Sequence, residues 1–157
     1  MIDARTLAER VFAVIDGQRW ADYETVMHPD VEMTSPFATL HSAADWVEFS
    51  RSFAVAMPDG KHTVTRVVQS GERFAFEGRW TGTHTGPLAT PNGQVPPTGR
   101  TVTLPFCAVG TQREGRVSAV SVYLDQLDML AQLGLVPQPE PGASVTTSAL
   151  KMSPASE

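Results

Sequence analysis

The sequence contains very little cysteine and no concentration of positive charge. Cys107 is the only cysteine among 157 residues, so an internal disulfide is impossible and the reducing cytoplasm is the expected location. The 12 Lys and Arg residues are scattered singly among 17 Asp and Glu residues, and the net charge is −5. Because nucleic acids and anionic membranes bind clustered cations, we expect neither as a partner.

Long apolar runs and the common cofactor motifs are also missing. No stretch approaches the roughly 20 apolar residues of a membrane span, and the N-terminus lacks the apolar core of a secretory signal. The sequence has no GxGxxG, GxxxxGK[ST] or GxSxG motif. The histidines do not have the i, i+4 spacing of a helical zinc site; they are His28, His41, His62 and His84. These absences give little support to a metal site or a nucleotide cofactor.

Helical periodicity is concentrated in the first third of the chain. It predicts helices over residues 3–16, 19–27 and 42–57. Asp3 is the expected N-cap of the first helix, and Ser42 is the expected N-cap of the third. A turn over residues 28–30 is expected after the second helix.

Alternating apolar residues and many Val and Thr residues predict strands in the remainder. The expected strands cover residues 31–35, 62–69, 73–83, 100–111 and 116–124. Phe74, Phe76 and Trp80 share one face of the third of these strands. Residues 85–99 are rich in Pro and Gly and predict a long loop, and residues 127–133 predict a last short helix.

Helices gathered before a series of strands indicate an α+β fold. We expect a curved antiparallel sheet wrapped around the N-terminal helices, forming a cone with an apolar pocket. Residues 1–136 are expected to form this single domain. Residues 137–157 have many Pro, Ser and Thr and no periodicity, which predicts a disordered C-terminal tail or a strap that orders on a dimer partner.

Three segments carry a resemblance to a known family. They are residues 28–33 (HPDVEM), residues 76–86 (FEGRWTGTHTG) with 96–100 (PPTGR), and residues 123–126 (YLDQ) with 130–134 (LAQLG). In this order they resemble the SnoaL-like polyketide cyclases, also called ester cyclases. That family has the nuclear-transport-factor-2-like cone fold shared with ketosteroid isomerase.

The resemblance implies a reaction without cofactor. Family cyclases close the last ring of an aromatic polyketide ester by intramolecular aldol condensation, in antibiotic biosynthesis, with one aspartate as general acid/base. By motif match that aspartate is Asp125. The family also contains members with hydroxylation roles, so membership alone does not fix the reaction.

Asp125 and His84 are the candidate catalytic residues. Asp125 follows an apolar strand and precedes the last helix, so it is either a pocket base or the N-cap of that helix. His84 stands where a strand enters the long loop, and it is either a second proton carrier or a structural loop histidine. Tyr123 shares the strand face of Asp125 and is expected to donate to an enolate oxygen or to form pocket wall.

The candidate substrate-binding residues are Tyr123, Trp80, His62, Trp46 and Phe49. His62 begins a strand, and its side chain is a candidate for the pocket. The aromatic residues either line a cavity for a planar polycycle or pack as ordinary core. The expected partner is accordingly a small hydrophobic or polycyclic substrate.

Other functions remain open at this stage. A double-bond isomerase needs the same base, and an epoxide hydrolase would pair Asp125 with Arg79 or Arg100 to hold a water. A non-catalytic small-molecule-binding module is a further alternative. A homodimer is expected because apolar residues occupy both faces of the strands over 100–111 and 116–124.

Overall fold

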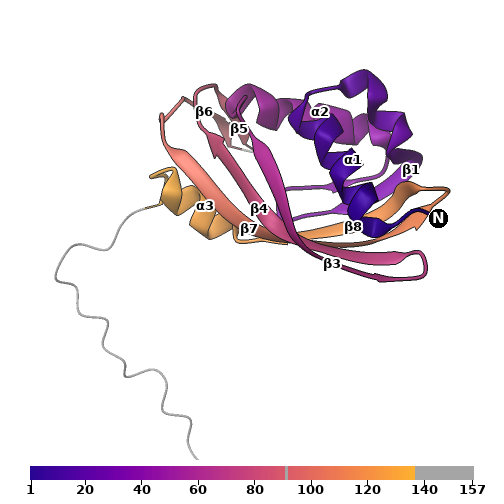
Figure 1. Cartoon of the computed structure of the whole chain (residues 1–157). Coiled ribbons are helices and arrows are strands. Elements are labelled where there is room, and N and C mark those ends of the chain that lie inside the picture. Colours follow the sequence, from indigo (N-terminus) through magenta and orange to yellow (C-terminus); the bar gives the residue numbers. More distant parts are fainter. Residues whose placement is uncertain (91, 137–157) are drawn as a thin grey trace, which may run out of the picture.

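The sheet is curved, and two helices pack on its inner face (Figure 1). The computed structural model describes residues 1–90 and 92–136. Helix α1 (Ala4–Asp16) contacts β3, and helix α2 (Ala43–Ala56) contacts β1. The strands in their order across the sheet are β2 (Thr39–Leu40), β1 (Met27–Thr34), β8 (Arg116–Leu124), β7 (Thr101–Arg113), β4 (Arg73–Thr83) and β3 (Lys61–Ser70). The α+β class and the helix-covered curved sheet are therefore as predicted.

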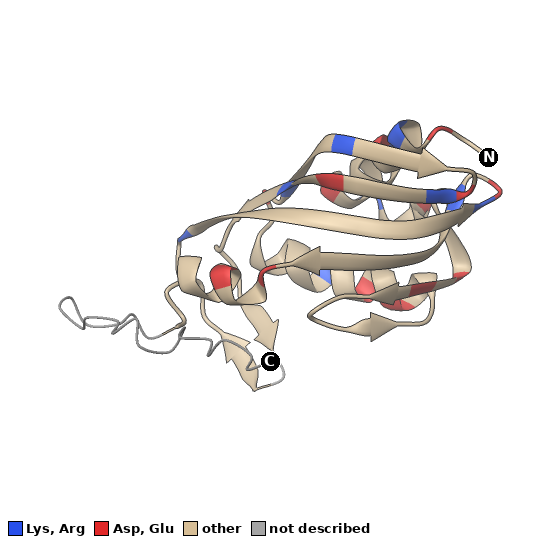
Figure 2. Cartoon of the chain, turned by 90° about the horizontal axis from the view of Figure 1, so that it is seen from below, with Lys and Arg blue, Asp and Glu red and all other residues tan. Residues whose placement is uncertain are grey.

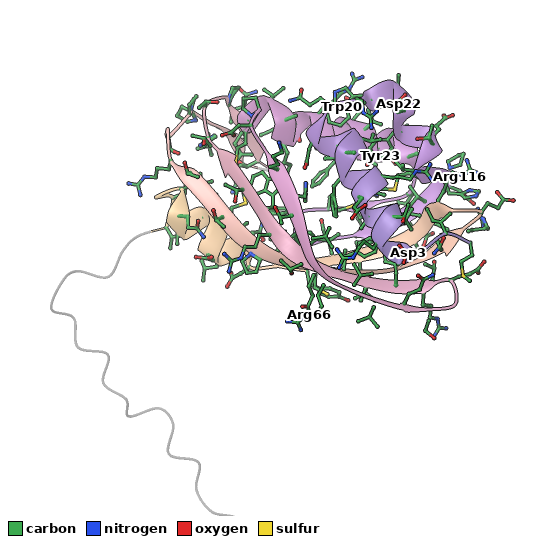
Figure 3. All side chains as sticks on the ribbon, in the orientation of Figure 1. Asp3, Trp20, Asp22, Tyr23, Arg66 and Arg116 are labelled. Atoms are coloured by element: carbon green, nitrogen blue, oxygen red, sulfur yellow. The ribbon has the colours of Figure 1, made fainter. Side chains whose placement is uncertain are left out.

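The two long helices begin where their capping residues predicted. The Asp3 carboxylate accepts a hydrogen bond from the Thr6 N–H, and the Ser42 hydroxyl accepts one from the Asp45 N–H. Asp3 is seen at the start of α1 in Figure 3. The helix expected over residues 19–27 is the shorter 3-10 helix η1 (Trp20–Thr25). These caps satisfy N–H groups that have no partner inside the helix.

The sheet is mixed rather than purely antiparallel, which corrects the prediction. β1 runs parallel to β8, with Met33 opposite Val120, while the other pairings are antiparallel. β1 also begins at Met27, so residues 28–30 lie in a strand and not in a turn. The pairing with β8 shifts register between Met27 and Glu32, and Pro29 falls in this irregular stretch, where its missing N–H is tolerated.

The region expected to be one long loop contains a hairpin. β5 (Leu88–Thr90) pairs with β6 (Gly93–Val95), and β5 packs against α2 through the buried Leu88. The sequence did not predict this hairpin, because residues 85–99 are rich in Pro and Gly and each strand is too short to show alternation. The last helix, α3 (Gln126–Gln132), is present as expected. The predicted tail, residues 137–157, lies outside the described residues.

The core lies between the helices and the inner face of the sheet. Phe74 and Phe76 are each only 3% exposed and stack with ring centroids 4.3 Å apart. Leu7 and Val11 of α1 pack into the same cluster. A second cluster joins the end of α2 to β7 and α3, and its members are Ala56, Met57, Leu88, Val102, Leu104, Met129 and Leu133.

Candidate functional site

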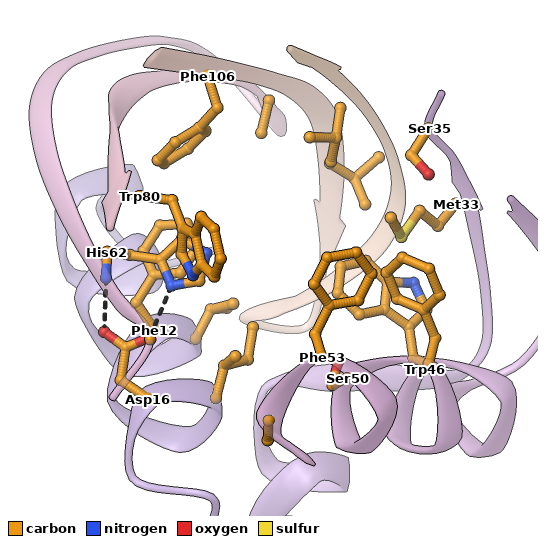
Figure 4. Close-up of a pocket in the computed structure, with 18 of the residues that line it drawn as sticks. Phe12, Asp16, Met33, Ser35, Trp46, Ser50, Phe53, His62, Trp80 and Phe106 are labelled. Atoms are coloured by element: carbon orange, nitrogen blue, oxygen red, sulfur yellow. Dashed lines mark hydrogen bonds and ion pairs between the residues drawn. The ribbon is translucent and has the colours of Figure 1, made fainter. Parts of the chain in front are cut away.

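A cavity of about 180 Å³ lies between α1, α2 and the inner face of the sheet (Figure 4). Its wall is mainly apolar and aromatic. Trp46, Phe49, His62 and Trp80, all singled out from the sequence, line it. An apolar cavity with a few polar groups is the usual form of a small-molecule site.

The aromatic side chains of the wall contact one another in a chain. Phe53 of α2 lies 5.1 Å from Phe49, 5.3 Å from Phe37 and 6.4 Å from Trp80 between ring centroids. Phe49 and Phe53 stand one turn apart on α2, so the helix presents both rings on the same side. These contacts fix the shape of the wall without filling the cavity.

Asp16 and His62 form a hydrogen-bonded pair at the wall of the cavity. His62 Nδ1 lies 2.6 Å from Asp16 Oδ1, and the His62 backbone N–H donates to Asp16 Oδ2 at 2.8 Å. Because an ionised carboxylate only accepts hydrogen bonds, this contact places a proton on Nδ1. No described residue makes a hydrogen bond to His62 Nε2, so the neutral ring keeps a lone pair for a ligand.

Two phenylalanines hold the His62 ring in place. Phe12 stacks on it with centroids 4.3 Å apart and an interplanar angle of 14°. Phe106 meets its edge at 5.6 Å and 81°. The side chains of Asp16 and His62 are only 14% and 18% exposed, so the pair is largely shielded from solvent. A rigid, shielded Asp–His pair can accept and return a proton at one defined atom.

Asp16 was missed by the sequence analysis, although a signal exists. It ends α1, where the carbonyl groups of the last turn already carry partial negative charge. A carboxylate is electrostatically unfavourable there, so its presence suggests a partner from another element. Phe12 lies one turn before it on the same face of the helix. The identity of the partner could not be inferred, because β3 is far away in sequence.

Asp125 does not line the cavity, which corrects its expected placement. Its side chain accepts a hydrogen bond from the Asp128 N–H at 2.9 Å, so it is the N-cap of α3, and it is exposed to solvent. The alternation of β8 explains this. Val120, Val122 and Leu124 point to the cavity, so Tyr123, which is 61% exposed, lies on the outer face. The sequence pattern paired Tyr123 with Asp125 but did not show which face is inside.

His84 is fully buried but does not line the cavity either. Its Nδ1 accepts the Thr98 N–H at 3.2 Å, and its backbone N–H and C=O pair with Arg100 and Gly99. The proton of the neutral ring is therefore on Nε2, which has no partner among the described residues. The expected position of His84 at the pocket mouth is corrected, and the side chain instead closes the loop over residues 84–100.

Two further motif residues, Gln132 and Gly134, also make structural contacts. Gln132 of α3 binds both backbone groups of Thr103, accepting its N–H at 2.8 Å and donating to its C=O at 3.0 Å. Gly134 has a φ of +73°, and a Cβ there would lie 2.8 Å from the Arg100 guanidinium carbon. We call His84, Thr98, Arg100, Gln132 and Gly134 the motif cluster. It ties the loop and α3 to β7.

The part of the chain that the structure describes, residues 1–90 and 92–136, shows neither a metal cluster nor a membrane-spanning helix. No group of three or more His, Cys, Asp or Glu side chains there is arranged to hold a metal ion. None of the helices there combines the length and the hydropathy needed to cross a membrane.

Solved structures similar to this chain share its fold. A candidate SnoaL-like polyketide cyclase from Jannaschia sp. CCS1 is 20% identical, with a TM-score of 0.72, covering 84% of this chain and 92% of its own. IdmH, a candidate polyketide cyclase from Streptomyces antibioticus, is 22% identical, with a TM-score of 0.73 and coverages of 85% and 99%. AclR, a candidate hydroxylase from Streptomyces galilaeus, is 23% identical, with a TM-score of 0.72 and coverages of 87% and 84%.

Family membership rests on the sequence itself. No curated protein matches the chain. The family model for the SnoaL-like polyketide cyclases matches residues 5–133, which include α1 except its first residue, the whole sheet and α3. The cone of helices and sheet, its apolar cavity and this match lead to one assignment: the chain belongs to the SnoaL-like polyketide cyclase family.

Proposed function

We propose that the protein is a cofactor-independent acid–base enzyme that closes a ring in a polyketide-like ester by an intramolecular aldol-type reaction. The observation that carries this proposal is the 2.6 Å contact between Asp16 and His62 at the wall of an apolar cavity. His62 is the proposed proton carrier, in place of Asp125, because Asp125 is exposed and caps α3.

The proposed reaction begins with proton transfer to His62. Nε2 accepts a proton from the carbon next to a carbonyl group, and the C–H electron pair becomes an enolate. Asp16 stabilises the positive imidazolium that forms, because its carboxylate remains bound to Nδ1–H. The enolate carbon then attacks a second carbonyl of the same molecule, and the new alkoxide takes the proton back from Nε2.

The cavity contributes by folding the substrate. An open chain must bring two of its own carbons together, and a wall of fixed aromatic rings restricts it to few conformations. The same wall excludes water, which would otherwise compete as a proton donor to the enolate.

The proposal is tested by comparing His62→Gln with Asp125→Asn. Heptane-2,6-dione is a suitable probe, since its aldol closure and dehydration give 3-methylcyclohex-2-enone, whose absorbance reports the rate. We expect His62→Gln to lower the rate by roughly 10²–10⁴-fold, the usual worth of a general base. Asp125→Asn should keep the wild-type rate, because an amide also caps a helix.

Two results would contradict this assignment. If the wild-type protein closes the ring no faster than buffer does, the proposed enzymatic function is wrong. A loss of rate in Asp125→Asn, with His62→Gln fully active and both variants folded by circular dichroism, would return the base to Asp125.

A non-catalytic small-molecule-binding module is the second candidate. The exposed position of Asp125 favours it, since the carboxylate expected from the family resemblance is not at the cavity. It predicts that ligands bind the cavity while the rate of ring closure stays at the level of buffer. The same assay therefore separates the two candidates.

We also propose that the protein is a homodimer through the outer face of the sheet. Val68, Ala75, Val109 and Ser121 form one row across four neighbouring strands, and Val68 and Val109 are 62% and 46% exposed. Seen from below in Figure 2, β7 and β8 carry charge only at their ends. Light scattering should give twice the chain mass, and Val109→Lys should reduce it to one chain. A wild-type monomer would contradict the proposal.

A further inference from the structure

One side of the cavity carries a buried hydrogen-bond donor that lacks a partner. Trp46 of α2 is only 8% exposed and lines the cavity, and its Nε1–H makes no hydrogen bond with any described residue. Leaving such a donor unpaired costs free energy, and buried polar groups in native proteins nearly always have an acceptor. A bound molecule is the natural source of that acceptor at a cavity wall.

Other polar groups lie close to Trp46. Ser50 stands one turn further along α2, is mostly buried and also lines the cavity. Tyr23 of η1 is buried beside Trp46, with ring centroids 6.1 Å apart. Burial raises the pKa of the Tyr23 phenol, and the neighbouring Ser50 hydroxyl offsets part of this rise. Hydroxyl and indole groups thus gather on one part of a wall that is mainly apolar and aromatic.

The size of the cavity limits the ligand. A cavity of roughly 150 Å³ is known to hold one benzene ring. The volume of about 180 Å³ here therefore has room for one ring with a short substituent. The cavity is partly open to solvent, so the rest of a larger ligand, such as a planar polycycle, can extend out of it.

The cavity is polar at two separate places. Figure 4 shows Asp16 and His62 on one side and Trp46 on the other, with the aromatic wall between them. A ligand that satisfies both places has an apolar body, an acceptor oxygen toward Trp46 and a reactive carbon toward His62.

We propose that Trp46 Nε1 binds the carbonyl oxygen of a single-ring or ring-forming ligand. Ser50 supplies a second polar contact, and the opposite part of the ligand faces His62. The proposal rests on the proposed function only in taking this cavity as the substrate site. It names the substrate class as carbonyl compounds that place about one ring inside the cavity.

The test uses two unreactive probes of equal shape. Acetophenone carries a carbonyl oxygen, and α-methylstyrene has a CH₂ group in its place. Dissociation constants are measured by NMR titration of the whole protein. We expect Trp46→Phe to weaken acetophenone binding roughly 3–10-fold more than α-methylstyrene binding, which corresponds to one buried hydrogen bond. The melting temperature without ligand checks the fold separately, because the variant removes an unpaired buried N–H together with part of a packed ring.

Trp80→Phe is the matched control. Trp80 also lines the cavity, but its indole nitrogen is not a buried donor without a partner. Its truncation should therefore weaken both probes by the same factor. Ser50→Ala provides a second variant with little risk to the fold, and it should also weaken acetophenone more than α-methylstyrene.

Three outcomes would overturn the proposal. They are a failure of both probes to bind the wild-type cavity, an equal change of both constants in Trp46→Phe, and selective loss of acetophenone binding in Trp80→Phe instead. Because binding and not turnover is measured, these outcomes are distinct from a failure of His62 as the base.

Discussion

The motif cluster and the Asp16–His62 pair differ in how the sequence marks them: the first lies within the family motifs, and the second lies outside them. The motif cluster contains residues that make the chain resemble its family, and its contacts are mostly to backbone groups of the loop over residues 84–100, β7 and α3. The pair lies outside the motifs, yet it borders the cavity. The five residues of the motif cluster therefore hold the fold together and do not line the cavity, whereas other motif residues, such as Trp80, do.

The physical reason lies in what each region contacts. A side chain that binds a backbone N–H or C=O stabilises the fold in the same way for any substrate, because the backbone groups are the same in each case. A side chain at the cavity must match one substrate. Fold and reaction can therefore be carried by different residues, as the range of functions on shared folds requires. The following variants test this division, from the largest expected effect to the smallest.

Asp16→Asn should give the largest effect, on turnover. Asp16 accepts two N–H groups of His62 on separate oxygens, so an amide must turn its NH₂ group toward one of them. The ring then loses its orientation or takes the wrong tautomer. We expect the rate of heptane-2,6-dione closure to fall by roughly 10²–10⁴-fold. A well-folded variant with the wild-type rate would show that the pair is only structural.

His84→Ala should instead reduce stability. It deletes a fully buried ring and leaves the Thr98 N–H without its acceptor. We expect the free energy of unfolding to fall by about 3 kcal/mol. Denaturant titration measures this loss, and the rate per folded molecule should remain that of the wild type. Loss of turnover with unchanged stability would place His84 in the chemistry and break the comparison.

Gly134→Ala tests the end of the motif cluster. The residue has a φ of +73°, and a Cβ would approach the Arg100 guanidinium to 2.8 Å. We expect a loss of about 1–2 kcal/mol in the free energy of unfolding, mainly from the left-handed backbone. Gly71→Ala is the matched control, because Gly71 has a φ of +58° and no atom within 4 Å of its Cβ position. An equal loss in both variants would mean that the Arg100 contact adds nothing.

Asp125→Ala should have a smaller effect. It removes the acceptor of the Asp128 N–H at the start of α3, which is worth about 1 kcal/mol. Asp125→Asn should retain most of this stability. Comparing the melting temperatures of the two variants separates the cap from other roles, and identical losses in both would argue against a capping role.

Acid sensitivity at Asp59 should be the smallest effect. The Thr83 N–H donates to Asp59 Oδ1 at 2.7 Å and holds the pKa of that carboxyl below its usual range. A lowered folded-state pKa adds stability above the unfolded-chain pKa, roughly 4, and this stability is lost as the pH falls through the folded-state pKa. The melting-temperature advantage of the wild type over Asp59→Asn should therefore shrink in acid. A constant difference would contradict this contact.

Local features were predictable where neighbouring residues determine them. Asp3 and Ser42 cap their helices because a short polar side chain reaches only the next turn. The inward face of β4 followed from the alternation of Phe74 and Phe76. The parallel pairing of β1 with β8 was not predictable, because it joins segments about 90 residues apart and the sequence pattern of either strand fits both directions.

In the candidate site, too, local features were predictable and contacts between distant segments were not. His62 was singled out by the alternation of its strand, but its partner Asp16 comes from another element and carries no motif. Asp125 was singled out by the motif, and only the orientation of β8 decided that it lies outside the cavity.

The sequence by itself determined the family, the helices, most of the strands and which residues share a strand face, because these depend on local periodicity and capping. The tertiary structure decided which face of β8 points inward, that Asp16 meets His62, and that this pair borders an apolar cavity. These properties depend on how distant segments pack together. Alternation assigns residues to two faces, and only packing against α1 and α2 makes one of those faces the inside.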